Sequence, residues 1–313
     1  MSSSRVSGAR FDSPRRDLLN FALGRLGLVV LLLVSLRSFG SAANKEEAVV
    51  MVAVANLYST PSADSDVVSQ AIFGSNVAVV EKSPGWEKVE TSDQYTGWIR
   101  LEDARNLGAD GPGYAGAGRV AEVSSLAANL YRETDVTRHG PLLTVPFETR
   151  LEIVPQDEGQ SSGWVHVRLP DDRQAWVQRG DVDLAPHRLS IEESIALGRR
   201  FLGVTYTWGG RSSFGYDCSG FTQMLVASRG IAMPRDADLQ AAWTGAAAVD
   251  RRKLRSGDLL FFGSGPDHIT HTGMYIGHGR FIHDTTYGHP GVQISRVKDQ
   301  PWIRLLVACR RVK

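Results

Sequence analysis

The sequence predicts an α+β domain preceded by two small all-β modules. Three observations support this prediction. Short alternating apolar runs, separated by turn residues, fill residues 49–105 and 119–185. These two segments align with each other, which indicates an internal repeat. From residue 188 onward, helix signals come first and strand-like runs follow, an order typical of α+β domains.

The overall composition is that of a globular protein. The chain has 313 residues, of which 42% are apolar and 22% charged, and this length suits two or three domains. The formal net charge of +1 gives no electrostatic reason to expect a nucleic-acid partner. The most basic short patch, residues 251–255, is interpreted as solvated surface.

Residues 1–43 have the layout of a secretory signal peptide. Arginines precede an apolar run at 26–34, and small residues at 40–43 offer a cleavage site. The run is shorter than the roughly 20 apolar residues of a transmembrane helix, although residues 21–36 could form an uncleaved anchor. We therefore expect an exported protein, periplasmic or extracellular, which is membrane-anchored if the segment is retained.

The two all-β segments share aligned motifs, and each is expected to form a small barrel. The motifs are Ala55-Asn-Leu-Tyr58 with Ala128-Asn-Leu-Tyr131, Gly85-Trp86 with Gly163-Trp164, and Gly97-Trp98 with Ala175-Trp176. The tryptophans are interpreted as barrel core. Residues 106–118 between the copies are rich in Gly, Ala and Pro and are predicted to be a linker. This pattern resembles bacterial SH3-like domains, which implies binding to wall peptides or positioning of a catalytic domain.

Residues 188–313 begin with helices. Ser190 and Glu193 form a capping box, and the helix that follows should end at Gly203. Two further helices are predicted at 218–229, ended by Gly230, and at 236–243. The strand-like runs are 258–262, 271–276, 280–285, 292–296 and 304–312.

Cys218 lies at a loop-to-helix junction, where free N–H groups and the helix dipole favour a thiolate. It is therefore a candidate nucleophile. Two alternatives stay open: Cys218 is a small buried apolar residue, or it forms a disulfide with Cys309, since export favours paired cysteines. Cys309 lies in an apolar run that is predicted to be a buried strand.

Five histidines fall between residues 267 and 290, but none has zinc-site spacing with another or with a cysteine, so we expect no metal and no other cofactor. His271 and His283 lie on consecutive strands joined by residues 277–279. A three-residue loop would pair Ile276 with Arg280 and place both histidines on one face. A two-residue loop would place them on opposite faces.

A same-face arrangement completes a catalytic trio. His271 would take the proton of the Cys218 thiol and later protonate the leaving amine, while His283 would orient the His271 ring and stabilise its charged form. His268, His278 and His289 are interpreted as loop or surface residues.

The motifs of this domain resemble those of the NlpC/p60 cysteine peptidases, papain-like enzymes that cut bacterial cell-wall peptides. The matching motifs are Tyr206-x-Trp208-Gly-Gly, Asp217-Cys-Ser-Gly-Phe221, Gly257-Asp-Leu259, His271-Thr-Gly-Met-Tyr-Ile-Gly277 and Phe281-Ile-His283. The resemblance implies that Cys218 is the nucleophile, His271 the general base and His283 the third member. It also implies that Tyr206 is an active-site tyrosine that hydrogen-bonds near the nucleophile.

Two SH3-like domains before such a domain resemble the γ-D-glutamyl-L-diamino acid endopeptidases, or dipeptidyl-peptidases VI. The implied substrate is L-Ala-γ-D-Glu-diamino acid, with meso-diaminopimelate or Lys, cut after D-Glu in peptidoglycan turnover or recycling. By this resemblance Asp217 and Ser219 bind the free N-terminal amine, and Tyr95 of the first module lines the pocket. Judged from the residues alone, Asp217 is a helix N-cap and Tyr95 an exposed barrel tyrosine.

The chain departs from the family pattern at three places. Thr272 replaces an apolar residue, Asp284 replaces a small one, and residues 59–61 lack the acidic residue of the early barrel loop. Two alternative functions also stay open: a wall amidase or acyltransferase that uses the same trio, or a protein that binds the cell wall through its SH3-like domains.

Overall fold

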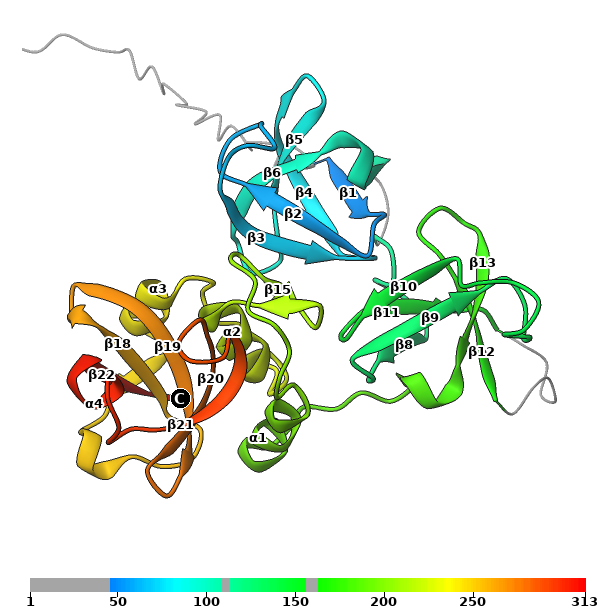
Figure 1. Ribbon diagram of the computed structural model, residues 1–313. Helices are drawn as coiled ribbons and strands as arrows, with labels where there is room; N and C mark the ends of the chain where they lie inside the picture. Colours follow the sequence, from blue (N-terminus) through cyan, green and yellow to red (C-terminus); the bar gives the residue numbers. More distant parts are fainter. Residues whose placement is uncertain (1–45, 109–112, 156–162) are drawn as a thin grey trace, which may run out of the picture. The chain divides into compact units, whose positions relative to one another are not determined.

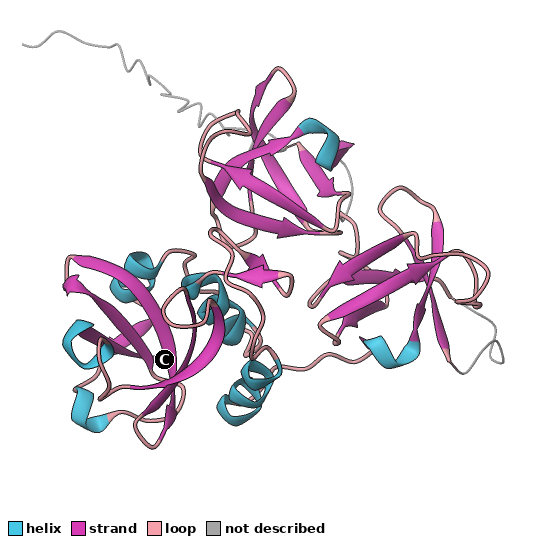
Figure 2. Ribbon diagram, viewed as in Figure 1, coloured by secondary structure: helices cyan, strands magenta, loops and turns pink. Residues whose placement is uncertain are grey.

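The computed structural model describes residues 46–108, 113–155 and 163–313, which fold into three sheet-containing regions (Figure 1; Figure 2). The predicted signal segment, residues 1–43, lies outside the described residues. Within the described part of the chain, no helix combines the length and apolar character needed to cross a membrane.

The first all-β segment forms one seven-stranded antiparallel sheet in the order β3-β2-β6-β5-β4-β1-β7. Its alternating side chains build a core that includes Leu57, Val89 and Ile99, all 0% exposed. The strands are β1 (Glu47–Val50), β2 (Val54–Tyr58), β3 (Val67–Ile72), β4 (Asn76–Ser83), β5 (Trp86–Glu90), β6 (Thr96–Arg100) and β7 (Ala104–Gly108).

The second segment repeats this topology, in the order β10-β9-β13-β12-β11-β8-β14, and so confirms the repeat. Neither sheet is a closed barrel, because the first and last strands of each order do not pair within the described residues. Alternation in the sequence specifies strands but not closure. The strands are β8 (Val120–Val123), β9 (Ala127–Tyr131), β10 (Leu143–Pro146), β11 (Arg150–Ile153), β12 (Trp164–Arg168), β13 (Gln174–Gln178) and β14 (Val182–Asp183).

The repeat tryptophans are mostly not core residues. Trp98 is buried, but the other three are half-buried. Trp86 packs edge-on against Tyr58 at 5.3 Å between ring centroids, and Trp164 repeats this contact with Tyr131 at 5.5 Å. These tryptophans therefore cover the edges of the two cores rather than fill them.

Part of the predicted linker is packed structure. Residues 106–108 complete β7, since Asn106 pairs with Ala48 of β1. Tyr114 is buried, and its hydroxyl donates to the carbonyl oxygen of Arg168 at 2.6 Å. The Gly, Ala and Pro content of this stretch is typical of a linker. It cannot reveal that backbone pairing and a single buried aromatic side chain hold the stretch in place.

The third region contains a six-stranded antiparallel sheet in the order β17-β22-β18-β19-β20-β21. Its strands are β17 (Ala246–Ala248), β18 (Leu259–Gly265), β19 (His268–Gly277), β20 (Arg280–Thr285), β21 (Gly291–Arg296) and β22 (Leu306–Val312). A separate two-stranded ribbon consists of β15 (Arg211–Ser212) and β16 (Gly215–Tyr216). The α+β prediction is confirmed, and four of the five predicted sheet strands have close to their predicted bounds. The fifth was predicted to begin at Arg304, but residues 302–305 are helical.

The helices of this region are α1 (Ile191–Arg200), α2 (Cys218–Ala227), α3 (Ala237–Ala242) and the short α4 (Trp302–Leu305). The capping box of Ser190 and Glu193 is present at the start of α1, which ends three residues before Gly203. Nearly all of α2 is buried, because β19 and β20 cover one side while α1, α3 and β15 cover others. The helix that carries Cys218 is therefore held on several sides.

Candidate active site

The β19–β20 hairpin brings the two predicted histidines together. Its turn is the two-residue pair His278-Gly279, closed by Gly277 opposite Arg280, so the prediction of a three-residue loop is wrong. A bulge at Ile276 adds one unpaired residue, after which Met274 lies opposite Ile282. That register is the one a three-residue loop would have produced, so the predicted same-face arrangement is confirmed.

The two imidazole rings are in direct contact. Nε2 of His271 lies 2.8 Å from Nδ1 of His283, and the ring planes meet at 73°. This approach depends on Gly273, where an added Cβ would lie 2.9 Å from the Cβ of His283 and 2.8 Å from the ring of Phe281. Any side chain at residue 273 would therefore displace His283.

A hydroxyl group continues the chain of hydrogen bonds. Nε2 of His283 lies 2.9 Å from Oγ of Ser295 on β21. If Nδ1 of His271 accepts the thiol proton, Nε2–H of His271 must donate to His283, whose own Nε2–H then donates to Ser295. The geometry therefore defines one consistent set of tautomers. Ser295 was missed because nothing marks a lone serine in a strand.

Aromatic rings enclose the histidine pair. Trp302 of α4 lies 4.8 Å from the His283 ring and 5.1 Å from the His271 ring, measured between centroids. Phe281 and Phe262 cover further sides at 4.4 Å and 5.5 Å. This burial lowers the pKa of His271 to about 3 and the pKa of His283 well below its usual value. Both rings are therefore neutral at rest and can accept a proton.

Cys218 begins α2 and faces the strand that carries His271. The helix packs against β19, and Cys218 lines the same cleft as Ile269 and Thr270 of that strand. Cys218 and Cys309 are both free, so the disulfide alternative is excluded. Burial and the neighbouring Asp217 raise the pKa of the Cys218 thiol to about 12, so burial outweighs the helix N-terminus.

The resting pair is therefore a neutral thiol and a neutral imidazole. Cys309 is buried in β22, as predicted.

A buried arginine engages both predicted amine-binding residues. Arg235 is 1% exposed and bonds the carboxylate of Asp217 at 2.7 and 2.9 Å, and Oγ of Ser219 at 2.8 Å. The same carboxylate caps α2 by accepting from the N–H of Gly220 at 2.7 Å. Asp217 is thus an N-cap whose charge is already balanced. The sequence carried no signal for Arg235, since it follows an apolar loop.

A cleft of about 570 Å³ opens above Cys218. All the predicted substrate-binding residues line it, and Tyr95 of the first sheet is among them. The hydroxyl of Tyr95 donates to Oδ2 of Asp236 at 3.2 Å, and burial together with Asp236 raises the pKa of Tyr95 to about 12. Burial also raises the pKa of Tyr206. The other lining side chains are Asp66, Val67, Val68, Trp208, Ala237, Asp238, Ile269 and Thr270.

The first sheet is joined to this region by hydrogen bonds below the cleft. Nε of Arg235 donates to Oγ of Ser69 at 3.1 Å, and Nε2 of Gln223 donates to Asp93 at 2.8 Å. At Gly209 an added Cβ would lie 2.6 Å from the carbonyl oxygen of Val67, so the two backbones touch there. One wall of the cleft is therefore supplied by the first sheet.

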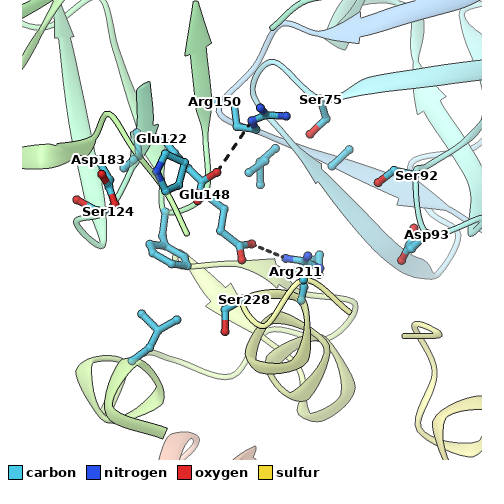
Figure 3. A pocket seen from close by; sticks show the side chains of 18 of the residues that line it. Ser75, Ser92, Asp93, Glu122, Ser124, Glu148, Arg150, Asp183, Arg211 and Ser228 are labelled. Atoms are coloured by element: carbon cyan, nitrogen blue, oxygen red, sulfur yellow. Dashed lines mark hydrogen bonds and ion pairs between the residues drawn. The ribbon is translucent and has the colours of Figure 1, made fainter. Parts of the chain in front are cut away.

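A larger cavity has a volume of about 660 Å³ (Figure 3). Two of its arginines are paired with carboxylates: Arg211 with Glu148 at 3.1 Å, and Arg150 with Glu122 at 4.0 Å. Burial raises the pKa of Glu122. None of the predicted catalytic residues lines this cavity.

Two of the three departures from the family pattern lie opposite each other on β19 and β20. Continuing the register of β19 and β20 places Thr272 opposite Asp284, and both are 0% exposed. Oγ1 of Thr272 and both carboxyl oxygens of Asp284 have no hydrogen-bond partner among the described residues. Burial, with a smaller effect of Asp217, raises the pKa of Asp284 to about 8. Thr272 points away from the histidine pair, as its strand alternation predicts.

Comparisons with known proteins agree with this geometry. Residues 203–311 match the NlpC/P60 family, and residues 53–104 match the bacterial SH3 domain. The chain is 33% identical over 230 residues to the gamma-D-glutamyl-L-lysine dipeptidyl-peptidase of Bacillus cereus, covering 69% of this chain and 66% of that protein. The protein of the same name from Bacillus subtilis is 28% identical over 261 residues, covering 79% and 82%.

A solved structure aligns with most of the chain. The crystal structure of an NlpC/P60 family protein from Bacillus cereus aligns with a TM-score of 0.73 at 27% identity, covering 85% of this chain and 99% of that one. The fold and the thiol–imidazole site define a cysteine peptidase. The chain belongs to the NlpC/P60 family and carries a bacterial SH3 domain before its catalytic domain.

Proposed function

We propose that this protein hydrolyses the bond between γ-D-Glu and the diamino acid of cell-wall peptides that begin with a free L-Ala. The observation that carries the proposal is the Cys218–His271–His283 arrangement beside a cleft walled by the first sheet. Two relatives named gamma-D-glutamyl-L-lysine dipeptidyl-peptidase support it. The diamino acid is Lys or meso-diaminopimelate.

The reaction follows from the positions of the groups. The Cys218 thiol gives its proton to Nδ1 of His271 while the sulfur attacks the γ-carbonyl carbon. His271 then returns that proton to the leaving amine, and the L-Ala-γ-D-Glu portion remains as a thioester on Cys218. Water loses a proton to His271, attacks the thioester and releases the dipeptide. His283 and Ser295 hold His271 in the tautomer that each proton transfer requires.

The lining of the cleft suits a substrate with a free amine. Asp66, Asp217, Asp236 and Asp238 line it, and among the described residues no Lys, Arg or His does so. The positive charge of Arg235 neutralises the carboxylate of Asp217. The carboxylate of Asp236, which accepts a hydrogen bond from Tyr95, therefore also attracts the substrate amine. Asp66 comes from the first sheet and supplies an acidic group that residues 59–61 lack. Asp217, Ser219 and Tyr95 remain the proposed amine-binding residues.

The test varies the substrate while the enzyme stays constant. L-Ala-γ-D-Glu-L-Lys and its meso-diaminopimelate counterpart are incubated with the protein, and the products are followed by mass spectrometry. N-acetylation of L-Ala should lower kcat/KM on the order of 100-fold, because a cationic group is lost from an acidic cleft. An N-methyl substrate, which keeps the charge, should lose much less.

Three outcomes would contradict the proposal. Equal cleavage of free and acetylated peptides would refute amine recognition. Ligated peptides instead of free L-Ala-γ-D-Glu would indicate acyl transfer. Full activity of Cys218→Ala in a wall-binding assay, with no cleavage by the wild type, would leave only wall binding by the SH3-like sheets.

The setting of the reaction follows from the same proposal. A peptidase for wall peptides must meet them outside the cytoplasm or during their turnover and recycling. We therefore propose export through residues 1–43, with cleavage or retention of that segment, and contact with the cell wall through the SH3-like sheets. Fractionation of cells that express the full chain would test this.

A further inference from the structure

A second concave site lies on the catalytic region, at the turn between β19 and β20. Its volume is about 620 Å³. The lining residues are Arg251, Arg252, His278, Gly279, Arg280, Arg296, Val297, Lys298, Ile303 and Leu306. None of them lines the cleft above Cys218. The basic patch that the sequence suggested to be plain surface is therefore one wall of a cavity.

The positive charge of this cavity is largely unbalanced. Arg252 is paired with Asp250 at 2.6 Å. Across the described part of the chain, no carboxylate forms a salt bridge with Arg251, Arg280, Arg296 or Lys298. In the part of the chain that the structure describes, no acidic side chain lines the cavity. In a chain with a net charge of +1, this concentration of cations in one place is unusual.

The register of β20 and β21 creates an electrostatic repulsion that a bound anion would relieve. Arg280 on β20 lies directly opposite Arg296 on β21. Like charges directly opposite each other on neighbouring strands destabilise a sheet. A bound anion between the two guanidinium groups would replace repulsion with two charge-assisted pairs.

The cavity also has an apolar side. Ile303 is 46% exposed, and Val297 and Leu306 beside it are half-buried. A small inorganic anion would leave this surface uncovered. A phosphate ester with an alkyl or glycerol portion would place its charge on the arginines and its carbon atoms on Ile303.

We propose that this cavity binds a phosphate ester or phosphodiester, at a site separate from the peptidase cleft. Arginine is the residue best suited to this ligand, because its planar fork matches two phosphate oxygens at once. The proposal goes beyond the peptidase function and does not depend on it. The ligand is either a soluble phosphate ester or the headgroup of an anionic lipid.

The test compares two variants with equal charge change. Arg280→Gln/Arg296→Gln removes the opposed pair, and Arg119→Gln/Arg132→Gln removes two exposed arginines of the second all-β segment. The full chain is titrated with inorganic phosphate and with glycerol 3-phosphate by calorimetry. It is also sedimented with vesicles of phosphatidylglycerol and of phosphatidylcholine. Peptide cleavage is measured on each variant to show that the fold is intact.

We expect the wild type and the Arg119/Arg132 control to bind glycerol 3-phosphate or phosphatidylglycerol vesicles. The Arg280/Arg296 variant should bind the same ligand at least tenfold more weakly. Binding of glycerol 3-phosphate identifies a soluble ester, whereas binding only to phosphatidylglycerol vesicles identifies a lipid headgroup. Absence of binding in every arm would overturn the proposal. So would equal losses in both variants, which would indicate general attraction to anions.

Discussion

The buried carboxyl group of Asp284 should make the stability of this protein depend on pH, and Asp284→Asn should remove that dependence. In the folded state burial raises the pKa of Asp284 from 3.8 to about 8. Above pH 3.8 the unfolded chain loses this proton while the folded chain keeps it. The contribution of Asp284 to the free energy of unfolding is therefore greatest below pH 3.8, and it decreases as the pH rises toward 8.

The size of the effect follows from the shift. Each unit of pKa difference corresponds to about 1.4 kcal/mol. Between pH 5 and pH 8 the unfolded group is ionised throughout, while the folded group is still half protonated at pH 8. The free energy of unfolding should therefore fall by about 4 kcal/mol across this interval because of Asp284 alone. The asparagine variant has no such group.

The assay is urea unfolding of the wild type, Asp284→Asn and the exposed control Asp64→Asn at pH 5, 6, 7 and 8. The stability difference between Asp284→Asn and wild type should grow with pH in favour of the variant. The control should follow the wild type at every pH. A difference that stays constant from pH 5 to pH 8 would show that Asp284 is not held protonated by the fold.

Two further predictions concern the histidine pair. Ser295→Ala should lower kcat on the order of tenfold with little change in KM, because the His283 N–H loses its acceptor; Ser295→Thr should restore activity, and failure to do so would assign Ser295 a packing role. Gly273→Ala should lower kcat at least 100-fold and cost about 1–3 kcal/mol of unfolding free energy, because its Cβ would displace His283. Gly163→Ala, where an added Cβ meets nothing within 4 Å, is the matched control, and equal kinetics of the two would contradict the clash.

Local patterns predicted what depends on local rules. The capping-box pattern of Ser190 and Glu193 predicted the start of α1. Period-two alternation predicted that His271 and His283 share one face. The aligned motifs of the two all-β segments predicted a shared topology, which the strand orders confirm. Closure of a barrel depends on the edge strands alone, and alternation carries no information about them.

Contacts between residues far apart in the sequence could not be predicted from local patterns. Arg235 meets Asp217 across 18 residues and Ser69 across 166, so no window of sequence contains the network. The same holds for Trp302, which reaches the histidine pair from a short helix near the C-terminus. The helix N-terminus at Cys218 suggested a lowered pKa, but burial, which is a property of the whole fold, determines its direction.

Because of the bulge at Ile276, His271 and His283 share a face only while the number of residues between them keeps its present parity. In the observed register, paired residue numbers such as 274 and 282 have an even sum, so odd-numbered residues of β19 and β20 share one face. The two-residue turn alone would give an odd sum, and the bulge restores the even one. Loss of either the bulge or one turn residue would turn every following side chain of β20 to the other face. Natural variation in the turn of this hairpin should therefore change its length only in steps of two.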